Sequence, residues 1–260
     1  MSSPLPAPTR AIVRSPSPRL GEGELTHLAR QPVDVPRALA QHAAYVSLLR
    51  AHGLELLHAP EAPEYPDAMF VEDVLTVIEG RAILTRPGAA SRRGEVTSME
   101  PLVRQLGLPT ERIEAPGRLD GGDVLVTERH VLVGRSSRSN VRALRQLASF
   151  HACRKRGVLG VSLAGVLHLR TALTRLPDGA LIALPGCVDT QQLRELGYTV
   201  HHAAEPSGAN VLCLGQRVVM PSDAPVTASR LQELGYEVVQ LEIGELQKLE
   251  AGLTCMSVLL

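Results

Sequence analysis

Aromatic residues are scarce in this 260-residue chain, which has no tryptophan, two phenylalanines and four tyrosines. A protein that binds single-stranded nucleic acid by stacking its bases needs several aromatic faces, so this class is disfavoured. The 27 basic and 27 acidic residues cancel to a formal net charge of zero. Because binding to nucleic acid or to a membrane surface relies on a large positive field, the charge balance argues against both.

Long apolar runs are also missing. No segment approaches the roughly 18 consecutive apolar residues that a membrane-spanning helix needs. The N-terminal sequence MSSPLPAPTR lacks the apolar stretch of a signal peptide. We therefore expect residues 1–9 to be a disordered lead, residues 10–260 to form a single domain, and the protein to be cytoplasmic.

The four cysteines lie far apart and form neither a CxxC pair nor another pattern typical of a zinc site. In a reducing compartment such cysteines are free thiols by default. Neither a disulfide framework nor a structural zinc site is therefore predicted.

A pattern of strand, polar loop, helix and strand recurs along the chain. Its clearest copies are residues 82–107, 131–150, 180–200 and 218–239, and a looser copy begins at 11–16 and continues through a helix over about 35–52. Apolar residues at every third or fourth position predict the helices. Gly107, Gly197 and Gly235 mark helix ends, where a positive φ is least costly for glycine. One unit of about fifty residues cannot bury its own apolar face, so we expect an α/β fold in which five ββαβ-like units close into a ring.

The first polar cluster is PDAMFVED, residues 66–73, in which Asp67, Glu72 and Asp73 supply three carboxylates. If this segment is extended, Asp67 and Asp73 share one face. Two carboxylates on one face suit a cation with several N–H donors, such as a guanidinium. The alternative is a solvated acidic loop, which the flanking apolar residues and the following strand disfavour.

The second cluster is LDGGD, residues 119–123, which lies directly before a predicted strand. Gly121 and Gly122 allow a tight turn or a close approach of the backbone to a ligand. Asp and Gly are equally typical of an ordinary hairpin turn. The pattern alone favours the hairpin turn.

A histidine and a cysteine lie in apolar surroundings. His168, in the predicted strand VLHLR, is more often a satisfied core residue than a catalyst when it occurs alone. Cys255, in GLTCMS, is by default a small buried hydrophobic residue. To act as a nucleophile it would need a cationic neighbour or substrate that favours the thiolate.

Two loops between a predicted strand and a predicted helix, residues 86–93 and 134–140, carry arginines that could hold a carboxylate. The alternatives are solvated or helix-capping loops. Together the clusters supply what attack on a guanidinium carbon requires. Acids hold the cation, a thiol attacks, a histidine handles protons and arginines bind an α-carboxylate. We expect Cys255, His168, Asp120 and Asp73 to lie around one pocket near the ring axis.

Six segments also resemble a known family, in the same order and with similar spacing. They are PDAMFVEDV, ILTRPGAASRRGE, LDGGDVL, VGRSSRSN, LHLRT and GLTCMSV. From about residue 10 to residue 260, the chain resembles the dimethylarginine dimethylaminohydrolases of the guanidino-group-modifying, or pentein, superfamily. The resemblance implies a five-bladed α/β propeller around a pseudo-fivefold axis. It also implies hydrolysis of asymmetric dimethylarginine or monomethylarginine to citrulline and dimethylamine or methylamine, through a covalent thiouronium intermediate and without a cofactor or metal.

The resemblance implies Cys255 as the nucleophile, His168 as the general acid and base, and Asp120 as the carboxylate that orients the histidine. It further implies a set of residues that contact the substrate. These are Asp67 and Asp73 at the guanidinium, Phe70 packed over it, Glu72 at the amino end, Arg92 and Arg138 at the carboxylate, and Leu20 and Leu249 as lining residues. The segment Gly208-Ala209-Asn210 is also similar to the family but lacks the cysteine often found beside that asparagine.

Two other functions stay open. The same chemistry serves a deiminase or hydrolase that acts on free arginine or on another guanidino or ureido substrate, although arginine deiminases are longer and carry an inserted helical region. A non-catalytic, ribosome-binding propeller factor would not need the cysteine, histidine and acids. We expect a small-molecule substrate, no nucleic-acid or membrane partner, and a monomer or homodimer.

Overall fold

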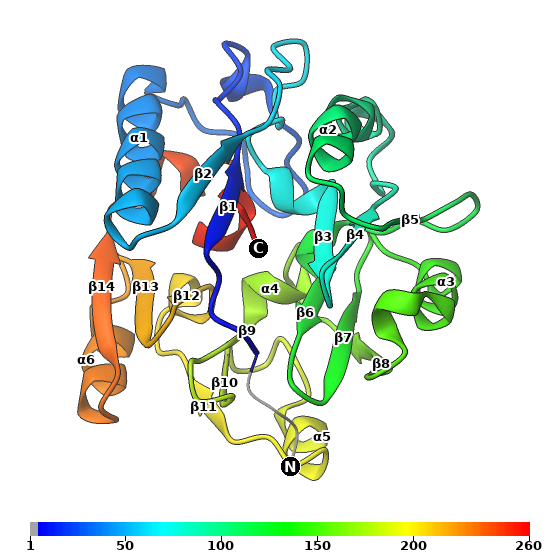
Figure 1. Cartoon of the computed structure of the whole chain (residues 1–260). Coiled ribbons are helices and arrows are strands. Elements are labelled where there is room, and N and C mark those ends of the chain that lie inside the picture. Colours follow the sequence, from blue (N-terminus) through cyan, green and yellow to red (C-terminus); the bar gives the residue numbers. More distant parts are fainter. Residues whose placement is uncertain (1–4) are drawn as a thin grey trace.

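Five three-stranded sheets surround a central axis in the computed structural model, which describes residues 5–260 (Figure 1). The sheets are β15 (Val258–Leu259), β1 (Arg10–Val13) and β2 (Glu55–His58); β3 (Leu75–Ile78), β4 (Arg81–Leu84) and β5 (Thr110–Arg112); β6 (Val124–Val126), β7 (His130–Arg135) and β8 (Gly157–Ser162); β9 (Leu173–Arg175), β10 (Leu181–Ala183) and β11 (Val200–His202); and β12 (Leu212–Leu214), β13 (Arg217–Pro221) and β14 (Glu237–Leu241).

All five sheets follow one plan. The middle strand pairs antiparallel with one neighbour and parallel with the other. A helix connects the two parallel strands, as a crossover between parallel strands requires. These helices are α1 (Val35–Ala51), α2 (Gly94–Gln105), α3 (Val141–Ser149), α5 (Thr190–Glu195) and α6 (Pro225–Glu233). They lie around the outside of the ring (Figure 1).

The ring is closed by the two ends of the chain. The last strand, β15, pairs with β1, and Ala11 lies opposite Leu259. The predicted ring of five ββαβ-like units is therefore confirmed. Gly107, Gly197 and Gly235 follow α2, α5 and α6 with φ of 64°, 86° and 91°, as predicted for helix-ending glycines.

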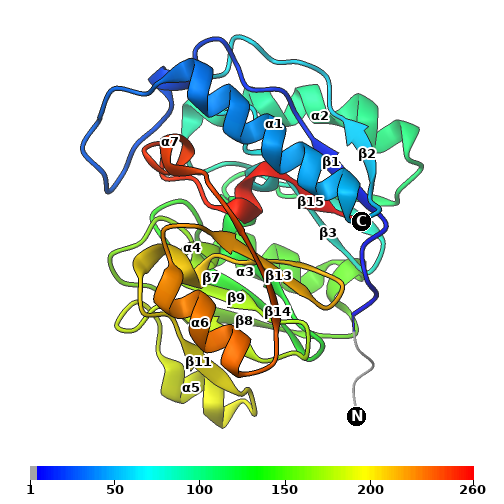
Figure 2. The ribbon, with the colours of Figure 1, turned by 90° about the vertical axis from the view of Figure 1, so that its left-hand side faces the viewer.

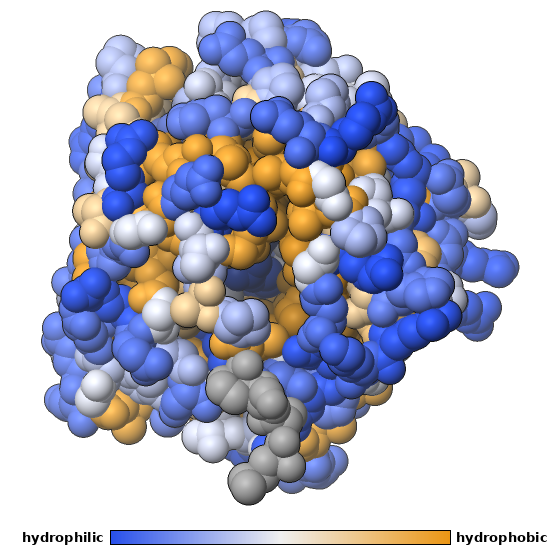
Figure 3. Space-filling view, viewed as in Figure 1, coloured by the Kyte–Doolittle hydropathy of each residue, from blue (hydrophilic) through white to orange (hydrophobic). Residues whose placement is uncertain are grey.

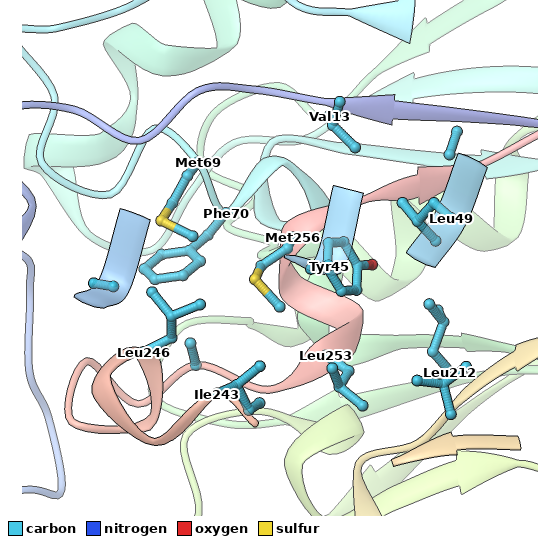
Figure 4. Packing of buried hydrophobic residues seen from close by; sticks show 14 of the residues in the cluster. Val13, Tyr45, Leu49, Met69, Phe70, Leu212, Ile243, Leu246, Leu253 and Met256 are labelled. Carbon is cyan, nitrogen blue, oxygen red and sulfur yellow. The ribbon is translucent and has the colours of Figure 1, made fainter. Parts of the chain in front are cut away.

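The apolar core is divided into clusters that lie between the sheets and the outer helices. One cluster contains Tyr45 and Leu49 of α1 together with Leu253 and Met256 near the C-terminus (Figure 4). The hydroxyl groups of Tyr45 and Ser257 also lie 2.7 Å apart. This packing fixes the segment that carries Cys255 against the inside of α1.

The predicted disordered lead is only partly described, because residues 1–4 lie outside the described residues. Residues 5–9 form no helix or strand. Thr9 donates its N–H to the carbonyl of Leu260 at 2.8 Å and accepts from the N–H of Glu55 at 3.0 Å. The proposed boundary at residue 10 stays a prediction. Within the described part of the chain, no helix has the length and apolar content needed to cross a membrane.

Candidate active site

A small cavity is lined by segments that are far apart in the sequence. These segments include the loop after β1 and the loop after the short helix α7 (Gly244–Gln247). Figure 2 shows the loop after β1 and helix α7 on the left-hand side of the molecule, whereas the C-terminus lies on the right. The cavity is therefore formed by connecting segments, where ligand groups of α/β folds commonly lie.

His168 lies between two carboxylates in this cavity. It is the residue before the short helix α4 (Leu169–Ala172), so its predicted place within a strand is wrong. Its Nε2 lies 2.9 Å from Oδ2 of Asp120, and its Nδ1 lies 3.7 Å from Oδ1 of Asp73. Burial by itself lowers the pKa of His168, but the charges of Asp73, Asp120 and Asp123 outweigh burial and raise the pKa to about 9. The imidazole is therefore protonated at neutral pH.

The two glycines of LDGGD bring the backbone close to these groups. Gly121–Asp123 is a turn of 3₁₀ helix before β6, so the hairpin turn favoured by the sequence is wrong. A Cβ atom on Gly121 would lie 1.9 Å from the carbonyl oxygen of Glu72. A Cβ atom on Gly122 would lie 2.8 Å from Nδ1 of His168 and 2.9 Å from Oδ1 of Asp73. No other residue fits without displacing the site.

Asp120 lies behind the histidine and is completely buried. Its Oδ1 accepts the N–H of Gly88 at 2.7 Å, while its Oδ2 faces His168. The backbone bond fixes the carboxylate, which in turn fixes the imidazole plane. Asp120 is therefore suited to orient His168 and not to contact a ligand.

Cys255 lies in the 3₁₀ helix Leu253–Met256 and is partly exposed in the cavity. Its Sγ accepts the N–H of Gly252 at 3.4 Å. Burial, with added repulsion from the carboxylates of Glu72 and Asp73, raises the pKa of Cys255 to about 12. The thiol of Cys255 is therefore neutral at physiological pH in this arrangement.

The carboxylates of Asp67 and Asp73 come from one segment and both belong to the cavity. The segment that carries them forms turns and the 3₁₀ helix Val71–Asp73, so the extended conformation considered from the sequence is wrong, yet Asp67 and Asp73 both line the cavity. Burial raises the pKa of Asp67, although Arg92 opposes the shift. Burial also raises the pKa of Asp73, but His168 and Arg92 outweigh it and hold that pKa below its usual value. Asp73 is therefore an anion at neutral pH.

The two arginines of the cavity differ in how fully they are paired. Arg92 is buried, donates two bonds of 2.9 Å to Glu95, and lies 2.5 Å from Oδ2 of Asp73. Arg138 donates to the hydroxyl of Thr26 at 2.8 Å, and its Nη1 lies 3.8 Å from Asp120. The guanidinium of Arg138 is the one with capacity left for an anionic ligand.

Asp73, Asp120 and His168 also offer three ligand atoms within 4.8 Å of one another. Such a set could hold a divalent cation. These atoms are already engaged with each other, with Gly122 and with Arg92. The sequence-based expectation that no metal is bound stays a prediction.

Comparisons with known proteins agree with this arrangement. The sequence model of the family described as "N,N dimethylarginine dimethylhydrolase, eukaryotic" matches residues 29–154. A dimethylarginine dimethylaminohydrolase of Streptomyces coelicolor is 45% identical, over 96% of this chain and 96% of its own length. The chain belongs to the dimethylarginine dimethylaminohydrolase family. A second member, from Pseudomonas aeruginosa, is 34% identical over 95% of this chain and 97% of its own length.

Solved structures superimpose on nearly the whole of this chain. A Pseudomonas aeruginosa dimethylarginine dimethylaminohydrolase, a cysteine-to-serine mutant in complex with citrulline, superimposes with a TM-score of 0.90 at 32% identity. The superposition covers 98% of this chain and 100% of the Pseudomonas chain. The N-terminal domain of the cyanobacterial arginine dihydrolase ArgZ superimposes with a TM-score of 0.82 at 18% identity, over 96% of each chain, and shows the shared fold alone.

The structure brings most of the residues implied by the dimethylarginine dimethylaminohydrolase resemblance to the cavity wall. Those that line it are Asp67, Phe70, Asp73, Arg92, Arg138, His168, Leu249 and Cys255. Asp120, Leu20 and Glu72 are not among the lining residues. Asp120, which was expected around the pocket, lies behind His168 and is completely buried. Leu20 is completely buried in the apolar core, and the Glu72 carboxylate is bound by Arg170 and Thr254.

Four lining residues were not identified from the sequence: Glu24, Leu167, Glu250 and Ala251. Leu167 and Ala251 are close neighbours of residues that the motifs did identify. Glu24 and Glu250 belong to no motif. Glu250 has a φ of 59°, which is unusual for a residue other than glycine, but a backbone angle leaves no direct mark on the sequence.

Proposed function

We propose that this protein hydrolyses Nω-methylated arginine to citrulline and dimethylamine or methylamine. The observation that carries this proposal is the grouping of a thiol, a protonated imidazole and two carboxylates, from Cys255, His168, Asp67 and Asp73, around one cavity. The relatives named for this activity and the citrulline complex of the Pseudomonas protein support it.

Substrate binding follows from the charges. The guanidinium lies against Asp73 and Asp67, and Phe70 packs over its planar face. Arg138, whose guanidinium donates its hydrogen bond to the neutral hydroxyl of Thr26 and lies 3.8 Å from Asp120, takes the substrate carboxylate. Arg92 is held by Glu95 and Asp73, so we assign it the task of fixing Asp73.

Three further residues that the resemblance implies as substrate contacts are Leu249, Leu20 and Glu72. Leu249 lines the cavity beside the aliphatic part of the substrate. Leu20 supports Phe70 from the core. We assign Glu72 no contact with the substrate amino group, because its two carboxylate oxygens are already bound by Arg170 and Thr254.

The substrate itself activates the nucleophile. A guanidinium held by Asp73 offsets the carboxylate charges that disfavour ionisation of Cys255, so substrate binding lowers the pKa of the thiol and its proton leaves to solvent. The thiolate forms a bond to the central guanidino carbon. Protonated His168 donates its proton to the departing amine nitrogen as the C–N bond breaks, which leaves a thiouronium on Sγ.

The same two residues complete the cycle. Neutral His168 takes a proton from a water molecule while the water oxygen attacks the thiouronium carbon. Collapse of the adduct breaks the C–S bond, the second proton of the attacking water passes to solvent, and citrulline and the thiolate are released. Asp120 holds the imidazole in one orientation through both steps, as its buried hydrogen bond to Nε2 suggests.

The direct test measures citrulline from asymmetric dimethylarginine with the wild-type protein and with Cys255→Ser. We expect product from the wild type and a loss of at least about 10³-fold in the variant, because serine is a far weaker nucleophile at neutral pH. Acid quenching during turnover, followed by peptide mass spectrometry, should place an adduct on Cys255. Equal citrulline formation by both proteins would overturn the covalent mechanism.

A comparison of substrates separates the proposal from its alternatives. Asymmetric dimethylarginine, monomethylarginine and free arginine are assayed side by side, with kcat/KM as the measure. Preference for a methylated substrate supports the proposed function. Preference for free arginine would make the protein a deiminase, and no turnover of any of the three would favour the non-catalytic alternative.

We further propose that the protein is cytoplasmic and acts as a monomer or homodimer without a nucleic-acid partner. A cysteine nucleophile must stay reduced, and a reducing compartment preserves the four free thiols. Light scattering coupled to gel filtration measures the oligomeric state. An assembly larger than a dimer would contradict this part of the proposal.

A further inference from the structure

The amide of Asn210 lies between the segment that carries Cys255 and the segment that carries His168. We propose that Asn210 is a positioning residue that fixes the nucleophile relative to the acid and base. This inference deepens the proposed function and rests on it, because it assumes that Cys255 and His168 are the reacting pair. Asn210 itself does not line the cavity.

The contacts of Asn210 use its whole amide group. Its Oδ1 accepts the N–H of Thr254, the residue before Cys255, at 3.2 Å. Its Nδ2 donates to Oγ1 of Thr254 at 3.0 Å and to the carbonyl of Arg170 at 2.9 Å. Arg170 follows His168 by two residues, in α4. One side chain therefore ties the two reactive segments together.

These bonds belong to a closed cycle of hydrogen bonds among four residues. The hydroxyl of Thr254 donates the next bond of the cycle, to Oε2 of Glu72 at 2.9 Å. The guanidinium of Arg170 donates to Oε1 of Glu72, and the carbonyl of Arg170 returns to Asn210. The cycle joins four different parts of the propeller. Glu72 lies before β3, Arg170 in α4, Asn210 before β12 and Thr254 before β15.

None of these four residues lines the catalytic cavity. Glu72, Arg170 and Thr254 line a second hollow that the terminal segments surround. A hollow is visible at the centre of the propeller in Figure 3, with both hydrophobic and hydrophilic side chains around it. The four residues therefore lie outside the cavity to which the substrate is assigned.

Close packing leaves Asn210 little freedom. The residue is 6% exposed. A Cβ atom added to Gly252, at the start of the Cys255 segment, would lie 2.4 Å from Cγ of Asn210. On the other side, the hydroxyl of Thr174 donates to the carbonyl of Ala209 at 2.7 Å and accepts the N–H of Val211 at 3.2 Å. Because close packing fixes the side chain of Asn210, its hydrogen bonds can fix the positions of Thr254 and Arg170.

The consequence falls on the chemical step. A shift of about 1 Å in the attacking atom can reduce a rate about 10²-fold even when the substrate still binds. Loss of the Asn210 amide frees Thr254, and with it Cys255, to move relative to His168. The residues assigned to the guanidinium and to the carboxylate of the substrate remain in place. The expected signature is therefore a lower kcat with little change in KM.

The test uses Asn210→Asp, which keeps the shape and the oxygen that accepts from Thr254 but loses the two N–H donors. We expect kcat for asymmetric dimethylarginine to fall about 10–100-fold, with KM within about 3-fold of the wild type. Gln146→Glu is the matched control. Gln146 bridges the N–H and carbonyl of Glu114 at 2.8 and 2.9 Å on the outer helix α3, so its loss should leave kcat within about 2-fold.

Variants of Thr254 test the same link from the other side. Thr254→Val removes the hydroxyl and should lower kcat as Asn210→Asp does, whereas Thr254→Ser should recover most of that loss. Residues that act through one link give non-additive effects, so the double variant Asn210→Asp, Thr254→Val should be little slower than the slower single variant. Additive effects on kcat, a kcat equal to that of the wild type, or a raised KM alone would each overturn the proposal.

Failure of the proposed function is recognised separately, because the wild type would then form no citrulline. In that case the alkylation rate of Cys255 by iodoacetamide at pH 8, followed by peptide mass spectrometry, decides the role of Asn210 without any substrate. We expect at least about 5-fold faster alkylation in Asn210→Ala, which adds no charge beside the thiol, because release of the turn exposes the thiol more often. A rate within about 2-fold of the wild type would overturn the positioning role.

Discussion

Oδ2 of Asp120 lies 2.9 Å from Nε2 of His168, and both side chains are almost completely buried. In this setting the carboxylate holds the ring in one orientation and also favours its protonated form. The relationship links two motifs that the sequence separates widely. It makes the protonation state of His168 a property of the folded site and not of the histidine alone.

Asp120→Asn tests this relationship. Asparagine can still accept the N–H of Gly88, but it places no negative charge beside the imidazole. We expect kcat to fall about 10²–10³-fold, the range typical of impaired general acid and base catalysis. The alkaline limb of the kcat profile should also move to lower pH, because the pKa of His168 falls. Unchanged pH dependence together with a kcat within about 3-fold of the wild type would contradict this assignment.

The raised pKa of His168 also predicts a pH-dependent contribution to stability. The pKa is about 9 in the folded protein and lies near 6.5 in an unfolded chain. A raised value means that the contribution is fully present below about pH 6.5 and is lost as the pH rises through 9. We expect the free energy of unfolding of the wild type, relative to His168→Gln, to fall by on the order of 3 kcal/mol between pH 6 and pH 10.

Denaturant unfolding at a series of pH values measures this difference. The exposed residue His202 offers a control, because His202→Gln should follow the wild type across the same range. A constant difference between the wild type and His168→Gln would show that the carboxylates do not stabilise the charged imidazole.

The sequence predicted the fold well because the signal is local and repeated. Helical spacing of apolar residues located α2, α3, α5 and α6, and glycines located several helix ends. Five weak copies of one unit could be combined, which offset the weakness of each. The closure of the ring by β15 and β1 was expected only in general terms, because β15 has two residues and therefore almost no pattern of its own.

The site was predicted unevenly for a physical reason. Motif residues in fixed segments, such as Cys255 and Asp73, were found because the resemblance is carried by short continuous strings. The pairing of Arg92 with Glu95 and Asp73 was not found, since an arginine bound by acids and an arginine free for a ligand look the same in a sequence. Contacts of the loop after β1 were also missed, because they join residues more than 200 positions apart.

Gly122→Ala should disable the site through one methyl group. The added Cβ atom would lie 2.8 Å from His168 and 2.9 Å from Asp73, closer than real Cβ contacts allow. We expect kcat/KM to fall at least about 10²-fold because both side chains must move. Gly21→Ala is the control, since no atom lies within 4 Å of the added methyl position and its φ is not in the left-handed region. Equal activity of Gly122→Ala and Gly21→Ala would contradict the close approach.

Glu250 binds the loop after β1 to the cavity rim. Its Oε1 accepts the backbone N–H groups of Thr26, His27 and Leu28 at 3.0, 2.5 and 2.6 Å. The hydroxyl of Thr26 in turn accepts from Arg138, the arginine that we assign to the substrate carboxylate. One carboxylate thus binds three consecutive N–H groups of the loop, and it belongs to a residue with a φ of 59°. Such a backbone angle costs about 1–3 kcal/mol outside glycine, so the three hydrogen bonds must offset it.

Removal of this carboxylate should loosen the loop without unfolding the ring. In Glu250→Gly the loop loses three hydrogen bonds, while the glycine relieves the unfavourable backbone angle, so the unfolding midpoint should change little. We expect faster trypsin cleavage after the exposed residue Arg30 and a KM for asymmetric dimethylarginine raised about 3–10-fold, because substrate binding must then order the loop. Glu250→Gln keeps a carbonyl acceptor in place and should lie between the wild type and Glu250→Gly in both measurements. Cleavage after Arg30 at the same rate in all three proteins would show that the loop is held by other contacts, among them the bonds of Arg30 to the carbonyls of Gly21 and Gly23.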